Sequence, residues 1–401
     1  MGRDGVLWGV RKMPRMKAVR LALVAAGAGI LAAVLLVVIL HVTSHKFVLV
    51  QPPRTEHPQA PGISIAKENF DLPDPFLFSD GKKYYLYLSS AFGNITSDPL
   101  GELPQHTPTL TGEPGHWSKK PFDAVPKLPD WAQPGLTWAP AVYELGHRYV
   151  MYVTFSVAGT KPLQHCIGIA TARRPSGPFH ARGTPFVCQK KLGGDIDPQL
   201  FVDPHGPRGP RQPNYLVWKS DNNSVPGDGT TSIWAQPLSN DGLTLEDKPV
   251  SLFQPTRKWE LPLVEAPQMA LSPQSTVWVF FSGGTGFFSP DYAMGAVKCK
   301  GPLGPCKDVL RGPLIASNRQ GAGPGEETYF VGGDGSDWLL YSPVHAQDLK
   351  RLFRPIEAAR IGWGKNGPYV GAAGSFPLAT CNVLGGDTSP SCSSRADSGS
   401  R

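Results

Sequence analysis

The chain has 401 residues, 40% of them hydrophobic and 10% aromatic, which excludes a disordered or low-complexity protein and suffices for a large buried core. Glycine (45) and proline (42) are frequent, so many turns and short strands are expected rather than long helices. The formal net charge of +7 is not a nucleic-acid-binding signal. Six basic residues and one acidic residue put +5 of it in residues 1–20, and the remaining +2 forms no basic cluster.

The N-terminal part of the chain has the features of a membrane anchor. Leu21 to Leu40 is an uncharged run of 20 residues, about the length that spans a bilayer as a helix. The basic segment before it predicts an N-terminus inside and the remainder outside. We expect a cytoplasmic tail (1–20), a single-pass anchor (21–42) and an extracytoplasmic stalk (43–66). The alternative is a secreted protein, but the run is long for a signal peptide and no small-x-small cleavage site follows it.

Six cysteines fit an oxidising compartment, because an even number of cysteines in an exported domain suggests disulfides. They fall into three pairs that are close in sequence, namely Cys166/Cys188, Cys299/Cys306 and Cys381/Cys392. Disulfides within these pairs are expected, and six buried free thiols are the alternative. The last pair lies in a Ser-rich C-terminal tail (381–401).

One aromatic and β-branched strand pattern recurs five times, 61 to 66 residues apart. The copies begin at Tyr84, Tyr149, Tyr215, Val277 and Trp338. Each follows a turn and is typical of the second arm of a hairpin. The first arm opens at a corner, and the corners are Asp74-Pro75, Ala139-Pro140, Asp197-Pro198, Ala266-Pro267 and Gly323-Pro324-Gly325. Five such hairpins with further strands predict an all-β, five-bladed β-propeller over residues 67–380, with a β-sandwich as the alternative.

Acids stand at three of these corners, namely Asp74, Asp197 and Glu265. An Asp before Pro is usually only a turn residue. However, the first strand of each propeller blade lines the central channel, so the repeat brings these residues to one end of it. Three acids at equivalent corners of blades 1, 3 and 4 therefore indicate an active site.

These corners, together with Trp138-Ala-Pro140, Asp195-Ile-Asp-Pro198 and Trp218-Lys219-Ser-Asp, resemble glycoside hydrolase family 43. This is the five-bladed arabinanase, arabinofuranosidase and xylosidase group, and the resemblance covers nearly the whole expected propeller. It implies a polysaccharide or oligosaccharide substrate with furanosyl or xylosyl linkages, such as an arabinan.

The resemblance also implies the roles of the acids. Asp74 would be the general base, Glu265 the general acid, and Asp197 the residue that orients Glu265 and raises its pKa. Inverting hydrolysis needs such a division, with the two carboxyls about 6.5–9.5 Å apart to admit a water molecule. A nearby anion helps to keep an acid protonated, because like charges resist joint ionisation.

Four further residues are weaker candidates. Trp138, Lys219 and Glu327 are candidate substrate contacts, although a core Trp, a Lys stem covering the blade and a solvated turn are the alternatives. His345 resembles the family histidine near the channel axis, beside a calcium ion or a water molecule, and a core histidine is its alternative. No cofactor is required, and a calcium ion would be structural.

Two other functions stay open. A non-catalytic carbohydrate-binding propeller is disfavoured because all three acids are present, but Ala141 and the fifth corner depart from the family pattern. A retaining fructan-type propeller would use the first acid as nucleophile, with the carboxyls about 5–5.5 Å apart. The Trp-Ala-Pro and Ile-Asp-Pro contexts favour the inverting enzyme. The sequence does not identify the sugar, nor does it separate endo from exo cleavage.

Overall fold

The protein is represented by a computed structural model that describes residues 63–67, 71–90, 106–204, 213–227, 229–287, 289–318, 321–345, 354–372 and 375–377. The expected cytoplasmic tail, the anchor, most of the stalk and the Ser-rich tail lie outside these residues. Within them, no helix has the length and hydropathy needed to cross a membrane. The chain divides into two units, Met1–Val50 and Gln51–Arg401, and everything that follows concerns the second unit.

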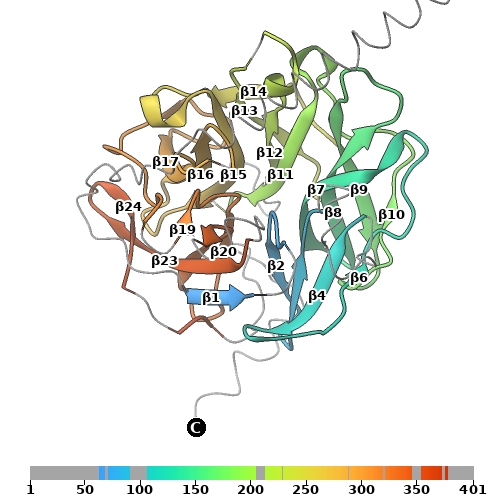
Figure 1. Ribbon diagram of the computed structural model, residues 1–401, viewed down its shortest axis with the longest axis horizontal. Coiled ribbons are helices and arrows are strands. Elements are labelled where there is room, and N and C mark those ends of the chain that lie inside the picture. Colours follow the sequence, from blue (N-terminus) through green and yellow to red (C-terminus); the bar gives the residue numbers. More distant parts are fainter. Residues whose placement is uncertain are drawn as a thin grey trace, which may run out of the picture. The chain divides into compact units, whose positions relative to one another are not determined.

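Five antiparallel sheets of four or five strands follow one another around a ring, which confirms the all-β, five-bladed propeller. The colours of Figure 1 pass once around this ring. Blade 1 contains β2 (Phe76–Ser79), β3 (Tyr84–Tyr87), β4 (Pro108–Glu113), β5 (His116–Trp117) and β6 (Phe122–Asp123), and blade 2 contains β7 (Ala132–Leu145), β8 (Arg148–Val157), β9 (His165–Ala172) and β10 (His180–Ala181). Blade 3 contains β11 (Asp195–Val202), β12 (Asn214–Ser220), β13 (Ile233–Leu238) and β14 (Val250–Phe253), and blade 4 contains β15 (Leu263–Leu271), β16 (Val277–Gly284), β17 (Ala293–Cys299) and β18 (Cys306–Lys307). Blade 5 contains β20 (Thr328–Val331), β21 (Asp337–Tyr341), β23 (Ile356–Gly364), β24 (Gly367–Val370) and β1 (Ile63–Ala66).

Smaller elements connect the blades. A two-stranded sheet pairs β19 (Gly321–Ala322) with β22 (Val344–His345), and short 3-10 turns occupy Lys190–Leu192, Asn222–Ser224 and Lys258–Glu260.

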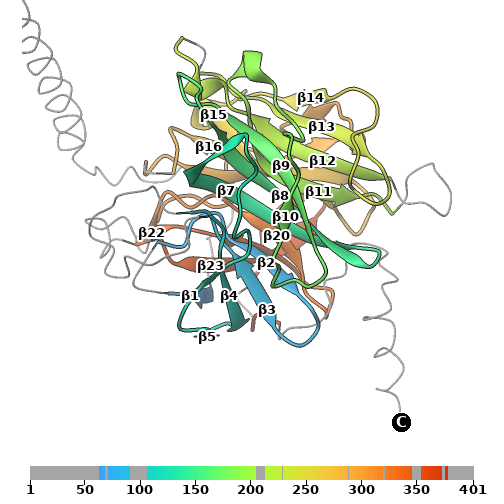
Figure 2. The ribbon, with the colours of Figure 1, turned by 90° about the vertical axis from the view of Figure 1, so that its right-hand side faces the viewer.

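The five recurring strand patterns are the second strands of the five blades, as predicted. These strands do not alternate between buried and exposed side chains, because β3 and β16 are buried at every position. A propeller blade packs against a neighbour on each face, so its strands are covered on both sides and have continuous apolar sequences. Figure 2 shows the strands of blade 2, β7 to β10, side by side as one such sheet.

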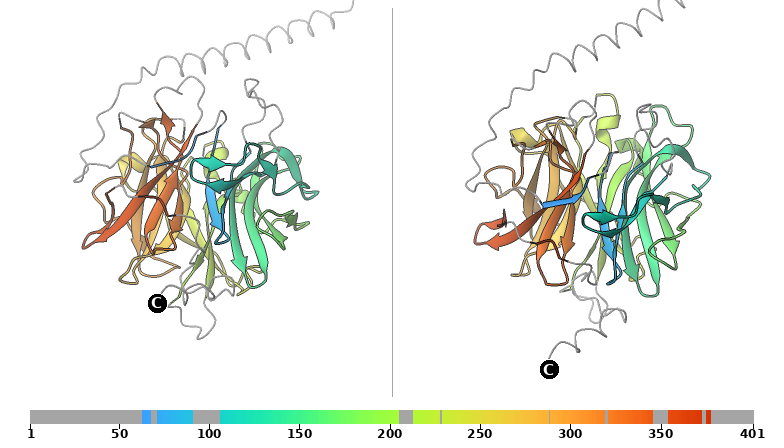
Figure 3. Two further views of the ribbon diagram at one scale, coloured as in Figure 1. Left: turned by 90° about the horizontal axis from the view of Figure 1, so that it is seen from below. Right: turned by 60° about the horizontal axis from the view of Figure 1, so that its bottom comes forward.

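The ring is closed by the N-terminal strand of the propeller. β1 pairs antiparallel with β23, with Ile63 opposite Ala358 and Ala66 opposite Ile356. Figures 1 and 3 show β1, in blue, beside the orange-red strands of blade 5. The Ile65 side chain is buried in a cluster that contains residues of both blade 1 and blade 5. The last four residues of the expected stalk therefore form part of the propeller.

Two of the three expected disulfides are confirmed. Cys166 in β9 is bonded to Cys188, and Cys299 in β17 is bonded to Cys306 in β18. Cys381 and Cys392 lie outside the described residues.

Closure of the ring through β1 predicts unequal effects of two adjacent substitutions. Ile65→Ala should lower the free energy of unfolding by about 2 kcal/mol or more, because it leaves a cavity between the first and last blades. Ser64→Ala, at an exposed position of the same strand, should change it by less than about 0.5 kcal/mol. Denaturant unfolding of the two variants measures the difference, and equal effects would show that β1 does not hold the ring closed.

Candidate active site

One backbone feature recurs at the inner strand of every blade. A non-glycine residue has a positive φ at each of five places: Asp74 (48°), Ala139 (46°), Asp197 (56°), Ala266 (50°) and Glu326 (54°). Side chains other than glycine rarely adopt this left-handed conformation. In blades 2, 3 and 4 the strand register shifts at the same place, as at a β-bulge. The fold thus turns the chain in the same way at each inner strand.

The acids occupy two different positions relative to this turn. Asp74, Asp197 and Glu326 stand at the positive-φ residue in blades 1, 3 and 5. In blades 2 and 4 that residue is alanine, and the acid of blade 4, Glu265, comes one residue earlier. The prediction that the three acids occupy equivalent positions in their blades is therefore wrong for Glu265. The residue of blade 2 at the position of Glu265 is Trp138.

The fifth corner also differs from the expected one. Its positive-φ residue is Glu326, which directly follows the predicted Gly323-Pro324-Gly325. Glu326 and Glu327 are 9% and 2% exposed, so they form a buried pair rather than a solvated turn. The fifth blade therefore adds an acid of its own to the channel.

All three predicted acids line one cavity of about 220 Å³, together with Trp138 and Lys219. We call this the larger cavity. Its walls also include Glu326 of the fifth corner and further polar and aromatic side chains that the sequence did not single out, among them Asp71, Ser89, His165, Asp221, Phe287 and Arg354. The structure thus brings together five of the seven predicted site residues, and the exceptions are Glu327 and His345.

Glu327 does not line the larger cavity. It lines a second cavity of about 20 Å³, which has room for about one water molecule, with Asp74, Asp197 and Glu326. Ser282 donates a hydrogen bond to one oxygen of Glu327, and the other oxygen has no hydrogen-bond partner. Burial raises the pKa of Glu327 to about 8, so this carboxyl group is protonated over much of the neutral range.

No metal site is evident among the residues that the structure describes, because they contain no group of three or more His, Cys, Asp or Glu side chains placed to hold an ion. His345 belongs to β22, but its side chain is outside the description. Its role beside calcium or water stays a prediction.

Asp74 is held between a hydroxyl and a cation. The Ser89 hydroxyl donates to its Oδ2 and in turn accepts a hydrogen bond from the Ala139 N–H at 2.8 Å. Burial raises the pKa of Asp74, and the positive charge of Arg354 opposes this rise. Arg354 is itself fixed by Asp71, to which its Nε and Nη2 donate at 3.0 and 2.7 Å. Ser89 and Arg354 both favour the ionised carboxylate.

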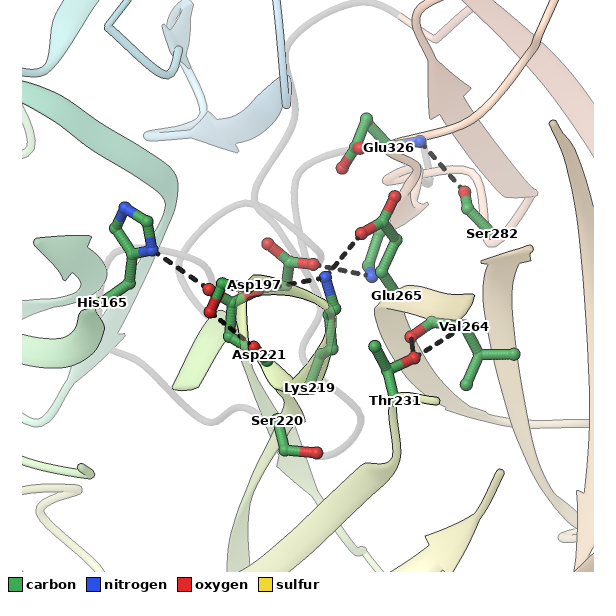
Figure 4. A network of polar contacts seen from close by, with 12 residues as sticks. His165, Asp197, Lys219, Ser220, Asp221, Thr231, Val264, Glu265, Ser282 and Glu326 are labelled. Carbon is green, nitrogen blue, oxygen red and sulfur yellow. Dashed lines mark hydrogen bonds and ion pairs between the residues drawn. The ribbon is translucent and has the colours of Figure 1, made fainter. Parts of the chain in front are cut away.

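Two donors contact Glu265. Lys219 Nζ donates to Oε2 at 2.8 Å, as Figure 4 shows, and the Tyr292 hydroxyl donates to Oε1 at 2.7 Å. The Tyr292 oxygen also lies 2.9 Å from Glu326 Oε1. A hydroxyl has one proton to donate, so the second contact is satisfied when Glu326 is protonated. Burial and the charges of the other acids raise the pKa of Glu326 well above its ordinary value, which agrees with this arrangement.

Asp197 lies between the other acids. Its Oδ2 accepts a hydrogen bond from the Ala266 N–H at 3.0 Å. Burial raises the pKa of Asp197 to about 8; Lys219 acts in the opposite direction, while Glu265 and Asp74 add to the rise. Because neighbouring carboxylates resist joint ionisation, the cluster retains protons at neutral pH.

Lys219 also connects Glu265 to a second acid outside the cluster. Its Nζ lies 3.5 Å from Asp221 Oδ1, and Asp221 Oδ2 lies 3.1 Å from His165 Nδ1. The His165 ring packs on Trp138, with 4.1 Å between ring centroids. Figure 4 shows His165, Asp221, Lys219 and Glu265 following one another across the site.

Four residues of the site were not predicted from the sequence, namely Asp221, His165, Tyr292 and Arg354. Asp221 could have been predicted, because this residue ends the Trp218-Lys-Ser-Asp segment. Tyr292 and Arg354 precede β17 and β23, outside the corners and outside any repeated pattern, so nothing in the spacing indicated them.

The raised pKa of Asp197 makes stability depend on pH. In the unfolded chain an Asp loses its proton near pH 4, whereas in the folded protein Asp197 keeps it until about pH 8. Between these values the folded state binds more protons, so the contribution of this group to the free energy of unfolding falls as pH rises. Asp197→Asn removes this contribution. From about pH 5 to about pH 8 the variant should therefore lose less stability than the wild type, by at least about 1 kcal/mol.

Denaturant unfolding across this pH range tests the prediction, with Asp130→Asn at an exposed position as the control. A decline in the Asp197→Asn variant as steep as in the wild type would contradict it.

Comparisons with known proteins agree with this fold and site. The sequence model described as "Glycosyl hydrolases family 43" matches residues 68–369. A thermostable family-43 glycoside hydrolase superposes with a TM-score of 0.64 at 20% identity, covering 80% of this chain and 100% of its own. An α-L-arabinofuranosidase from Lactobacillus brevis gives 0.59 at 20% identity, covering 77% and 95%. The Bacillus subtilis arabinanase gives 0.56 at 17% identity, covering 75% and 98%.

No curated protein sequence matches the chain. At these identities the solved structures show likeness of fold, and the family assignment depends on the match along three quarters of the sequence. The chain belongs to glycosyl hydrolases family 43 and is a glycoside hydrolase with a five-bladed β-propeller fold.

Proposed function

We propose that this protein hydrolyses furanosyl or xylosyl linkages of an arabinan-like glycan with inversion at the anomeric carbon. The observation that carries the proposal is that Asp74, Asp197 and Glu265, from three different blades, line one cavity. Inversion requires two carboxyl groups with opposite tasks, one ionised and one protonated. The surroundings of the acids support such a division.

Asp74 is proposed as the general base. It would take a proton from the attacking water molecule, and this requires the ionised carboxylate. Arg354 and the Ser89 hydroxyl favour that form against the effect of burial.

Glu265 is proposed as the general acid, which protonates the departing glycosidic oxygen. Asp197 would orient it through the shared backbone corner, since Asp197 accepts from the N–H of Ala266, the residue after Glu265. The cluster around Glu265 contains protonated carboxyl groups at neutral pH, as the raised pKa values of Asp197 and Glu327 indicate.

Trp138 is proposed to stack on a sugar ring. It is partly exposed, lines the larger cavity and is supported from behind by the His165 ring. An aromatic face held in this way provides a flat apolar surface for the C–H groups of a sugar.

The two proposed roles predict different effects of leaving-group chemistry. Glu265→Gln should lower kcat/KM on linear arabinan by about 10²–10⁴-fold, but far less on an aryl arabinofuranoside whose leaving group departs without a proton. Asp74→Asn should lower both rates strongly, because both substrates need an activated water molecule. Steady-state kinetics on the two substrates, with Asp130→Asn as an exposed control, measures this. Unchanged arabinan hydrolysis by Glu265→Gln would overturn the assignment of the acid.

We also propose that Leu21–Leu40 anchors the enzyme, with the cytoplasmic tail inside and the propeller outside. The length and lack of charge of this run and its basic flank support the proposal. The full-length protein should sediment with membranes and require detergent for release, whereas a chain that begins at Gln51 should stay in the supernatant. Full-length protein in the soluble fraction, or cleaved near residue 42, would contradict an uncleaved anchor.

A further inference from the structure

We propose that Lys219 is a positioning residue for the general acid: its ammonium group is shared between Glu265 and Asp221, and its movement toward Asp221 allows Glu265 to carry the catalytic proton. This inference rests on the proposed role of Glu265 and concerns what controls it. It also gives Lys219 a task other than the direct substrate contact expected from the sequence.

The geometry around Lys219 provides two places for one charge. Its side chain leaves β12 and is 1% exposed, so its charge depends on protein partners rather than water. Nζ is 2.8 Å from Glu265 Oε2 and 3.5 Å from Asp221 Oδ1. The four-carbon stem of a lysine is flexible. A small rotation near its end would exchange the short contact for the long one.

Asp221 is built to remain an anion. It contacts His165 Nδ1 at 3.1 Å, and His165 Nε2 is buried without a hydrogen-bond partner. Burial raises the pKa of Asp221, but the hydrogen bond from His165 and the charge of Lys219 outweigh it and lower the pKa below its ordinary value. Asp221 is thus a fixed alternative partner for the ammonium group.

The charge balance at Glu265 explains why such a partner is needed. The groups that face it or its neighbours from all packed elements are Lys219 and Asp197 of blade 3, Tyr292, Asp74 with Arg354 behind it, and Glu326 and Glu327 of blade 5. The Lys219 ammonium group attracts a carboxylate at Glu265, whereas the neighbouring carboxylates repel it. A general acid must hold a proton before bond cleavage and is an anion after it. A cation that stayed at 2.8 Å would stabilise only the second state.

The two positions of Lys219 therefore correspond to two states of the acid. After it has protonated the leaving group, Glu265 is a carboxylate and Lys219 pairs with it, as in the structure. When Glu265 takes up a proton from solvent, its attraction for the ammonium group falls, and Lys219 pairs with Asp221 instead.

The experiment is a pH titration of the Glu265 carboxyl carbon by NMR, in full-length protein labelled with ¹³C at glutamate side-chain carboxyls. The Glu265 signal is assigned by its loss in Glu265→Gln. Lys219→Met should move the titration midpoint up by about one pH unit or more, because the carboxylate loses its cation. Asp221→Asn should move it down, because Lys219 then has Glu265 as its remaining close partner.

A double-mutant cycle separates sharing from a direct effect of the Asp221 charge. If Asp221 acts through Lys219, adding Asp221→Asn to Lys219→Met leaves the midpoint of the single variant unchanged. A downward shift of equal size in both backgrounds, or no downward shift in Asp221→Asn alone, overturns the proposal. Lys219→Arg keeps the charge and should titrate near the wild type, and Lys298→Met is an exposed control. Asp221→Asn preserves shape, so the absence of a downward shift in this variant overturns the proposal even if Lys219→Met fails to fold.

Kinetics on linear arabinan then links the titration to catalysis. The alkaline limb of the pH profile of kcat/KM should move in the same direction as the NMR midpoint in each variant. If Lys219 only bound substrate, its substitution would raise KM without moving this limb. If the NMR midpoints shift as expected but the alkaline limb of kcat/KM stays fixed, Glu265 is not the general acid. The proposal that Glu265 and Asp221 share the Lys219 ammonium group then still stands. Midpoints that do not shift in variants that still hydrolyse arabinan would refute the sharing alone.

Discussion

Several carboxyl groups are buried together around one cavity, and this crowding is the physical constraint on which the site depends. Burial and mutual repulsion both favour their protonated forms. Two buried cations oppose this, and each does so at a different acid: Arg354 near Asp74 and Lys219 at Glu265. The surroundings of the acids therefore differ, because a cation acts on some of the carboxyl groups more strongly than on others. This is the condition for running base and acid catalysis in one cavity.

The propeller produces this crowding through its backbone. Every inner strand has one left-handed non-glycine residue, within the strand in blades 2, 3 and 4 and two residues before it in blades 1 and 5. All five of these residues line the smaller cavity, so the turn brings them together. Acids fill the turn in three blades, and alanines fill it in the other two. In the two blades with alanine, the residue before the alanine lines the larger cavity, and these residues are Glu265 and Trp138. Such turns are strained for non-glycine residues, and strand pairing along each blade together with ring closure by β1 holds them in place.

Much of this could be read from the sequence because the blades repeat. The spacing of the second strands predicted the number of blades, and the corners predicted that Asp74, Asp197 and Glu265 would meet. The position of Glu265 within its turn was not predictable, since a shift of one residue along a bulged strand leaves no mark in the spacing. The burial of Glu326 in the fifth corner was not predictable, because a glutamate beside glycine and proline is also typical of a solvated turn.

The partners of the acids were harder to predict than the acids. Tyr292 and Arg354 come from connections between strands. Tyr292 belongs to the same blade as Glu265 but lies 27 residues after it, and Arg354 comes from a different blade than Asp74, so no local pattern relates them to these acids. Contacts of this kind depend on how loops fold over a scaffold, which sequence periodicity does not encode. The strand β1 was assigned to the stalk because four residues are too few to show a pattern, and its pairing with β23 depends on residues nearly 300 positions away.

In the proposed mechanism Asp74 activates water while Glu265 supplies a proton, so that the sugar is released with inverted configuration. The decisive experiment is proton NMR of the first sugar released from linear arabinan, recorded before the anomers equilibrate. Inverting hydrolysis should give the anomer opposite to that of the cleaved linkage, and Asp74→Asn should release none. Release of the same anomer would mean that an acid attacks the sugar directly and would contradict the proposed division of roles.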